Sequence, residues 1–189
     1  KNIFPLIENQ DPRSVKGLWK KMTDLVFKEG NEGEKNHAIS ALDIALWDLK
    51  AKINQEPLWK TLGANTNSVK AYASGLDMCL DNNEISTFYG RMAKSGIDAG
   101  KLKVGLDLES DLERISIMKE SLSINNNRPH ICIDSNEFWS PKQAVRYINE
   151  IETKFDITWA EEPARRWDYA GLKKVSKGIK AAVATGENL

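Results

Sequence analysis

Two lysines, Lys101 and Lys103, flank a single Leu102 in a segment that otherwise has the composition of a buried strand. Side chains alternate across a strand, so residues two positions apart share a face. Both ammonium groups are therefore expected on one face of a sheet, with Leu102 and Val104 on the other. Burying two ammonium groups is costly unless something pairs with them or uses them. The spacing thus indicates a site that needs positive charge.

Three acidic residues end the next three strand-like segments, namely Asp134, Glu161 and Glu187. The carboxyl ends of successive barrel strands meet at one face, where barrel enzymes build their active sites. Three carboxylates gathered there repel one another unless a cation holds them. A set of oxygen ligands without His or Cys suits a hard ion, most simply Mg²⁺. The alternative, that each acid caps a helix or is a surface charge, explains one such residue better than three in consecutive units.

Together, these groups could remove a proton from the α-carbon of a carboxylic acid. The product is an enediolate, whose extra negative charge a cation and nearby ammonium groups stabilise. A lysine base must be neutral near pH 7, which an unperturbed lysine is not. A second ammonium group, a divalent cation and partial desolvation each favour the neutral form of Lys103. We therefore predict Lys103 as the base and Lys101 as its electrostatic neighbour and a contact to the substrate carboxylate; a buried ion pair is the structural alternative.

Strand-like and amphipathic segments alternate from about Val69 onward. This alternation is typical of parallel strands joined by right-handed crossovers, and hence of an α/β fold. One expected helix has a clear start signal, with Ser140 as N-cap followed by Pro141. Five βα units are visible, whereas a closed (β/α)8 barrel has eight, so we expect a partial barrel. The expected strands are residues 69–75, 100–105, 130–136, 156–163 and 181–188, and the expected helices are residues 82–94, 108–123, 140–155 and 167–177.

The segment before the barrel is expected to be helical. Two runs of apolar side chains recur at helical spacing, and two glycines separate them. We expect helices at residues 14–30 and 38–53, and divide the chain into a helical part, residues 1–66, and a barrel part, residues 67–189.

The composition is that of a soluble globular protein, with 41% hydrophobic and 29% charged residues. No stretch is apolar for long enough to cross a bilayer, and no secretory signal opens the sequence. The 27 basic and 27 acidic residues balance, and no basic block favours nucleic acid. Cys79 and Cys132 lack paired or metal-type spacing, which favours a reducing compartment. We therefore expect a cytoplasmic protein that acts on a small molecule and binds neither nucleic acid nor a membrane.

Five further residues could serve the site but have simpler structural explanations. His37 precedes the second expected helix and is interpreted as a cap or surface residue, and His130 begins its strand at the end away from the acidic residue. Trp139 either belongs to the core or lines the pocket. Arg165 and Arg166 could meet a second substrate carboxylate, although a solvated loop or a subunit contact is the preferred interpretation.

Five motifs span nearly the whole chain: "AISALDIALWDLKAK", the K-x-K of "KLKVG", "IDSN", "WAEEP" and "ATGENL". In order and spacing they resemble the mandelate racemase/muconate lactonizing enzyme family of the enolase superfamily. The resemblance implies a (β/α)8 TIM-type barrel preceded by an α+β capping domain, with residues 1–66 as the helical part of that domain. It also implies a Mg²⁺ cofactor.

By this resemblance, Lys103 is the α-proton base and Lys101 its electrostatic neighbour. The resemblance assigns the three carboxylates Asp134, Glu161 and Glu187 as the Mg²⁺ ligands.

Three neighbouring residues receive supporting roles from the same resemblance. Asn136 is a polar contact to the substrate or to metal water, Asn188 is a substrate contact, and Glu162 supports the adjacent ligand. The "GEN" ending resembles the mandelate racemase-like subgroup, which includes many acid-sugar dehydratases.

The resemblance implies a Mg²⁺-dependent lyase that dehydrates an aldonate or aldarate to a 2-keto-3-deoxy acid. A racemase or epimerase of a 2-hydroxy acid is the second hypothesis, in which the enediolate is reprotonated on its other face. A catalytically inactive fragment or binding module is the third, and the intact set of lysines and carboxylates argues against it. The family's His-Asp dyad and capping sheet have no counterpart in these residues, so the 189-residue chain alone is predicted to be inactive. The family tendency and the open edge of the barrel favour a homo-oligomer.

Overall fold

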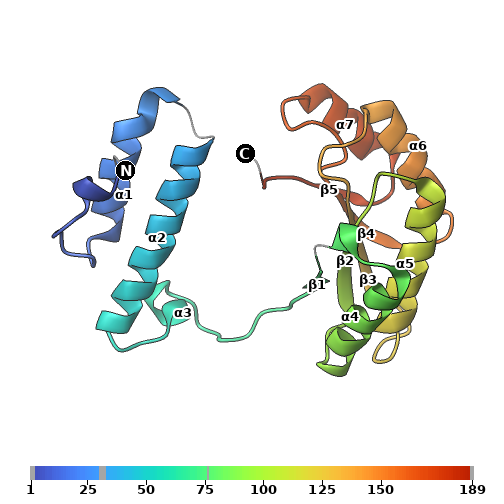
Figure 1. Cartoon of the computed structure of the whole chain (residues 1–189), viewed down its shortest axis with the longest axis horizontal. Helices are drawn as coiled ribbons and strands as arrows, with labels where there is room; N and C mark the ends of the chain where they lie inside the picture. The colour runs from blue at the N-terminus through green and yellow to red at the C-terminus, as the bar shows by residue number, and fades with distance from the viewer. Residues whose placement is uncertain (1–2, 30–32, 76, 188–189) are drawn as a thin grey trace. The chain divides into compact units, whose positions relative to one another are not determined.

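The chain folds as two compact units, Lys1–Val69 and Lys70–Asn188 (Figure 1). The computed structural model describes residues 3–29, 33–75 and 77–187. Each unit has its own hydrophobic core. Among the helices of the described ranges, none is both long enough and apolar enough to span a membrane.

The first unit is built from helices. Leu18 and Met22 of one helix lie at helical spacing and are buried in a cluster with Ile39 of the other. The second long helix begins at Glu34 and not at residue 38, so His37 lies within its first turn and is exposed. The prediction that His37 precedes this helix was therefore wrong. The elements are η1 (Phe4–Leu6), α1 (Val15–Val26), η2 (Phe27–Glu29), α2 (Glu34–Ile53) and α3 (Leu58–Thr61).

In the described part of the second unit, five parallel strands form one sheet in the order β1-β2-β3-β4-β5. An α-helix lies in each connection, which confirms the predicted α/β architecture. The two edge strands are shorter than expected, and within the described residues each pairs on one side only. The strands are β1 (Ala73–Ser74), β2 (Ala99–Lys103), β3 (His130–Asp134), β4 (Ile157–Glu161) and β5 (Ala182–Ala184); the helices are η3 (Asp77–Cys79), α4 (Asn82–Lys94), α5 (Leu108–Leu122), α6 (Pro141–Glu152) and α7 (Tyr169–Gly178).

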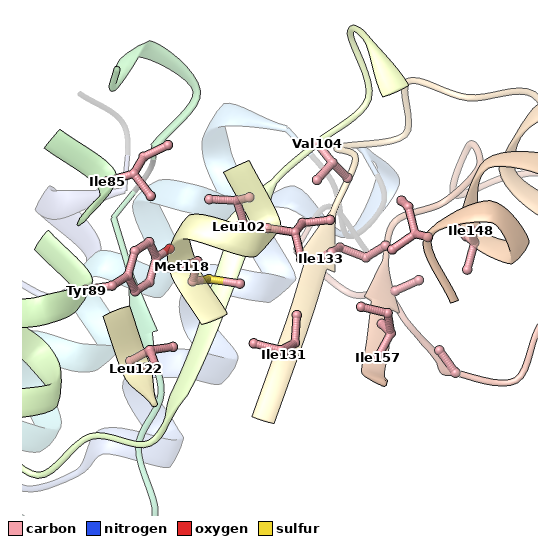
Figure 2. Packing of buried hydrophobic residues seen from close by; sticks show 14 of the residues in the cluster. Ile85, Tyr89, Leu102, Val104, Met118, Leu122, Ile131, Ile133, Ile148 and Ile157 are labelled. Atoms are coloured by element: carbon pink, nitrogen blue, oxygen red, sulfur yellow. The ribbon is translucent and has the colours of Figure 1, made fainter. Parts of the chain in front are cut away.

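Alternation along the strands separates the hydrophobic core from the charged residues. Leu102 of β2 and Ile133 of β3 are fully buried in a cluster that includes Met118 of α5 and Ile148 of α6 (Figure 2). The lysines and carboxylates lie on the opposite side of the same strands, as the period of two predicts. The core therefore fixes which face of the sheet carries the charges.

Side-chain caps fix the start of every α-helix in the second unit. In each case a side-chain oxygen at the N-cap accepts a hydrogen bond from a backbone N–H in the first turn, which satisfies a donor that the helix leaves free. The cap predicted for the helix at residue 141 is confirmed. The capping residues are Asp81, Asp107, Ser140 and Asp168.

Truncating the core of the sheet should destabilise the second unit. Ile133→Ala removes a side chain that is 1% exposed, and it is expected to lower the free energy of unfolding by about 2–5 kcal/mol because a cavity remains. Ile124→Ala makes the same chemical change at a side chain that is 61% exposed, and should change it by less than about 0.5 kcal/mol. Urea titration followed by circular dichroism measures both. Equal losses in the two variants would contradict this assignment of the core.

Candidate metal centre

Three carboxylates converge at the carboxyl ends of neighbouring strands. Asp134 ends β3, Glu161 ends β4, and Glu187 follows β5. One oxygen of each lies within 4.8 Å of the others. Asp134 is fully buried, Glu161 is partly buried and Glu187 is exposed. The structure thus brings together the three acidic residues identified from the sequence.

Both lysines of β2 reach this cluster. Register pairing places Lys103 beside Asp134, which in turn lies beside Glu161. The Lys103 Nζ atom is 2.6 Å from Asp134 Oδ2, and the Lys101 Nζ atom is 3.1 Å from the same oxygen and 2.7 Å from Glu161 Oε1. The two lysines are therefore ion-paired in this structure, the arrangement that the sequence left open as an alternative to chemistry.

Electrostatics keep Lys101 and Asp134 charged. Burial would lower the pKa of Lys101, but its hydrogen bonds to Glu161 and Asp134, with their negative charges, outweigh burial and raise it above its ordinary value. Burial would likewise raise the pKa of Asp134, yet Lys103, the Asn136 N–H and Lys101 outweigh it and hold the pKa below its usual range. The sequence predicted that Lys101 would act on Lys103 as a neighbouring positive charge, whereas both ammonium groups are paired with carboxylates in the structure.

Two aromatic side chains border the cluster on the same face of the sheet. The Trp159 indole N–H donates to Glu161 Oε2 at 3.1 Å, while Lys101 donates to Oε1. The Tyr72 ring packs edge-on against the Trp159 ring at a centroid distance of 5.3 Å. Both oxygens of Glu161 thus have a fixed donor. Trp159 was not among the candidate residues from the sequence; the available signal was that it lies two residues before Glu161 and so shares its face.

Removing the indole N–H should weaken cation binding without disturbing the fold. Trp159→Phe keeps an aromatic ring against Tyr72 but leaves Glu161 Oε2 without its donor, so Mn²⁺ affinity is expected to fall by about tenfold. Trp19→Phe, in the other unit, is the matched control and should leave the affinity unchanged. Isothermal titration calorimetry with Mn²⁺ measures both. Identical affinities in the two variants would refute a positioning role for the indole.

Cys132 lies on the charged face beside Lys101 in the register. Its side chain is buried, and burial raises the pKa of the thiol to about 12. A neutral thiol is a poor metal ligand. We therefore interpret Cys132 as a small apolar side chain of the sheet rather than as a ligand.

Asn136 lies directly beside the carboxylate cluster. Its backbone N–H donates to Asp134 Oδ1 at 2.9 Å, and its side-chain Nδ2 donates to Glu162 Oε2 at 3.2 Å. Burial raises the pKa of Glu162, and the charges of nearby carboxylates add to this while the Asn136 hydrogen bond opposes it. The contact of Asn136 with a substrate stays a prediction, and Asn188 lies outside the described residues.

The structure also describes the surroundings of three further residues considered from the sequence. Trp139 is 2% exposed and donates its indole N–H to the Gly105 carbonyl at 3.2 Å, so it belongs to the core and does not line a pocket. His130 is exposed at the start of β3, far along the strand from its acidic end. Arg166 forms an ion pair at 2.7 Å with Glu137, a buried acid that sequence reasoning missed because it lies in a loop without periodicity.

The chain matches two family models. Residues 85–189 match the enolase C-terminal domain-like family, and residues 1–63 match the mandelate racemase / muconate lactonizing enzyme N-terminal domain. The protein therefore belongs to the mandelate racemase/muconate lactonizing enzyme family of the enolase superfamily. The family expected from the motifs is confirmed, as is the partial TIM-type barrel.

Individual relatives act on sugar acids. Over its whole length the chain is 34% identical to a 3,6-anhydro-alpha-L-galactonate cycloisomerase of Streptomyces coelicolor and 33% identical to an L-talarate/galactarate dehydratase of Salmonella typhimurium, covering 52% and 47% of them. A solved structure of a racemase from Streptomyces coelicolor with bound magnesium superposes with a TM-score of 0.86 at 33% identity, over 100% of this chain and 52% of that one. The chain thus spans about half the length of the curated relatives it matches.

Proposed function

We propose that Asp134, Glu161 and Glu187 hold Mg²⁺ in an enzyme that removes the α-proton of a carboxylate substrate. The observation that carries this proposal is the convergence of three carboxylate oxygens within 4.8 Å, with two lysines ion-paired to Asp134 and Glu161. An all-oxygen donor set is the one that Mg²⁺ prefers. The magnesium in the similar racemase structure supports the same assignment.

In this proposal the two lysines have different tasks. Lys101 is held charged by Glu161 and Asp134, so it attracts the substrate carboxylate and stabilises negative charge that develops on it. Lys103, in its neutral form, accepts the α-proton at Nζ. The ammonium group so formed is stabilised by Asp134 Oδ2, which lies 2.6 Å from Nζ. A bound Mg²⁺ supplies further positive charge against the enediolate.

The favoured reaction is dehydration of a sugar-derived 2-hydroxy acid to a 2-keto-3-deoxy acid. The dehydratase and cycloisomerase relatives, both named for sugar acids, support this substrate class. Racemisation or epimerisation is the second candidate, supported by the racemase of known structure. Both begin with the same proton abstraction and differ in what happens to the enediolate.

The proposal also covers the organisation of the chain. Residues 1–66 are assigned to the helical part of a capping domain and residues 67–189 to the barrel, supported by the division after Val69. Because the chain spans about half of its relatives and a barrel needs eight strands, the activity is proposed for the protein at the full length its gene encodes. A cytoplasmic homo-oligomer acting on small carboxylates remains part of this proposal.

Proton exchange in D₂O tests the proposed reaction. The full-length protein is incubated with Mg²⁺ and a panel of aldonates, aldarates and simple 2-hydroxy acids, and NMR and mass spectra follow deuterium uptake and product. Deuterium uptake with formation of a 2-keto-3-deoxy acid supports the dehydratase, and uptake with a stereoisomer supports the racemase. Absence of uptake with every acid would refute the proposed chemistry and favour a binding module.

A further inference from the structure

The loops that follow β3 and β4 contain an unusual run of backbone conformations. Asn136, Glu137 and Glu162 all have positive φ, at 44°, 62° and 45°. Such left-handed conformations are unfavourable for residues with a side chain and persist where the surrounding structure holds them. Asn136 and Glu137 lie two and three residues after the proposed ligand Asp134, and Glu162 directly follows the proposed ligand Glu161. The contacts that hold these loops therefore also affect the position of the ligands.

Backbone hydrogen bonds join the two loops at Glu162. Its carbonyl oxygen accepts from Ser135 Oγ at 3.0 Å and from the Glu137 N–H at 2.8 Å. Its own N–H donates to the Ala184 carbonyl of β5 at 2.8 Å. Glu162 thus connects the carboxyl ends of the three strands that carry the proposed ligands.

An ion pair between Glu137 and Arg166 spans the same two loops. Arg166 Nε and Nη2 donate to Glu137 Oε1 and Oε2 at 2.7 and 3.2 Å, a two-point contact that fixes the orientation of both groups. The Glu137 carboxylate is only 3% exposed, and Arg165 Nη1 lies 3.9 Å from its Oε2. A carboxylate buried to this extent depends on its partner, because an unpaired buried charge is strongly unfavourable.

This ion pair is linked to the proposed metal centre through Asn136. The Asn136 N–H donates to Asp134 Oδ1 at 2.9 Å, while the lysines contact Oδ2. That N–H belongs to the first of the two consecutive left-handed residues, Asn136 and Glu137, so its position depends on how the loop that contains them is held. We propose that the Glu137–Arg166 pair is a positioning element that holds this backbone and so orients the Asp134 carboxylate; the inference rests on the proposed metal-binding function.

Amide exchange and cation binding together test this role in the 189-residue chain. In Arg166→Gln, the amides of Asn136 and Glu137 are expected to exchange with D₂O at least about tenfold faster than in the wild type, read from ¹⁵N NMR spectra. The dissociation constant for Mn²⁺ is expected to rise by about tenfold. Arg13→Gln breaks the exposed two-point pair with Asp11 and should leave both quantities within about twofold of the wild type.

Two further variants keep the test decisive if Arg166→Gln unfolds. Arg166→Lys retains the charge but not the planar fork, and Glu137→Gln retains the shape but not the charge. Each is expected to show faster amide exchange and weaker Mn²⁺ binding, both by a smaller factor than in Arg166→Gln. Unchanged exchange in a folded variant would overturn the positioning role, and so would faster exchange with unchanged Mn²⁺ affinity. Failure of the wild-type chain to bind Mn²⁺ would overturn the proposed metal centre itself. The amide-exchange measurement does not depend on Mn²⁺, so this failure is distinguishable from failure of the positioning role.

Discussion

Lys103→Ala is expected to lower α-proton exchange by about a thousandfold, because it removes the group proposed to accept the proton. The substrate and the cation should still bind, since the three carboxylates and Lys101 remain. The charge on β2 also changes in this variant, which by itself could alter the site. The measurement is deuterium uptake by a substrate acid, with Mn²⁺ affinity measured alongside.

Lys103→Arg separates the loss of the base from the loss of charge. A guanidinium group can still pair with Asp134 Oδ2, but it cannot act as a base near pH 7 because it stays protonated. The arginine variant should therefore be as slow as the alanine variant while keeping wild-type Mn²⁺ affinity within a few fold. Exchange at wild-type rate in either variant would show that another group removes the proton.

Glu161→Gln is expected to weaken Mg²⁺ binding by at least about a hundredfold, more than the loss expected for a residue that only supports a ligand. The substitution keeps the size of the side chain but removes the negative charge that the cation requires. Lys101 retains Asp134 as a partner at 3.1 Å, so the fold should persist. Calorimetric titration with Mg²⁺ and circular dichroism together measure affinity and integrity.

Glu162→Gln is the matched control for this prediction. Glu162 is adjacent in sequence and is buried, but its Oε2 accepts from Asn136 and it does not belong to the carboxylate cluster. Its amide oxygen can still accept that hydrogen bond, so Mg²⁺ affinity should change by less than about fivefold. A larger loss in Glu162→Gln than in Glu161→Gln would reverse the assignment of the ligand.

The sequence predicted the fold and the convergence of charges because both follow from periodicity. A period of two places Leu102 and Ile133 in the core and the lysines and Asp134 on the other face. Repetition of βα units then places the ends of successive strands side by side, which brings Asp134 and Glu161 together. The core positions and the convergence of Asp134 and Glu161 therefore both follow from repeating patterns that can be read along the sequence.

What the sequence did not predict depends on partners that are distant in the chain. The sequence left open an ion pair for Lys101 but did not identify its partner Glu161, which lies 60 residues away. The contact between Glu137 and Arg166 depends on two loops with left-handed residues. Trp159 could have been found from its spacing to Glu161, but its hydrogen bond required the rotamer that the structure shows.

Paramagnetic mapping with Mn²⁺ tests the central claim most directly, namely that Asp134, Glu161 and Glu187 form a cation site beside Lys103. Mn²⁺ is added in substoichiometric steps to the ¹⁵N-labelled chain, and the loss of each amide signal is recorded. The account predicts that signals around Lys103, Asp134, Glu161 and Glu187 disappear first, and that Glu161→Gln abolishes this pattern. Broadening centred on another acidic group, or signals that persist evenly along the chain, would contradict it.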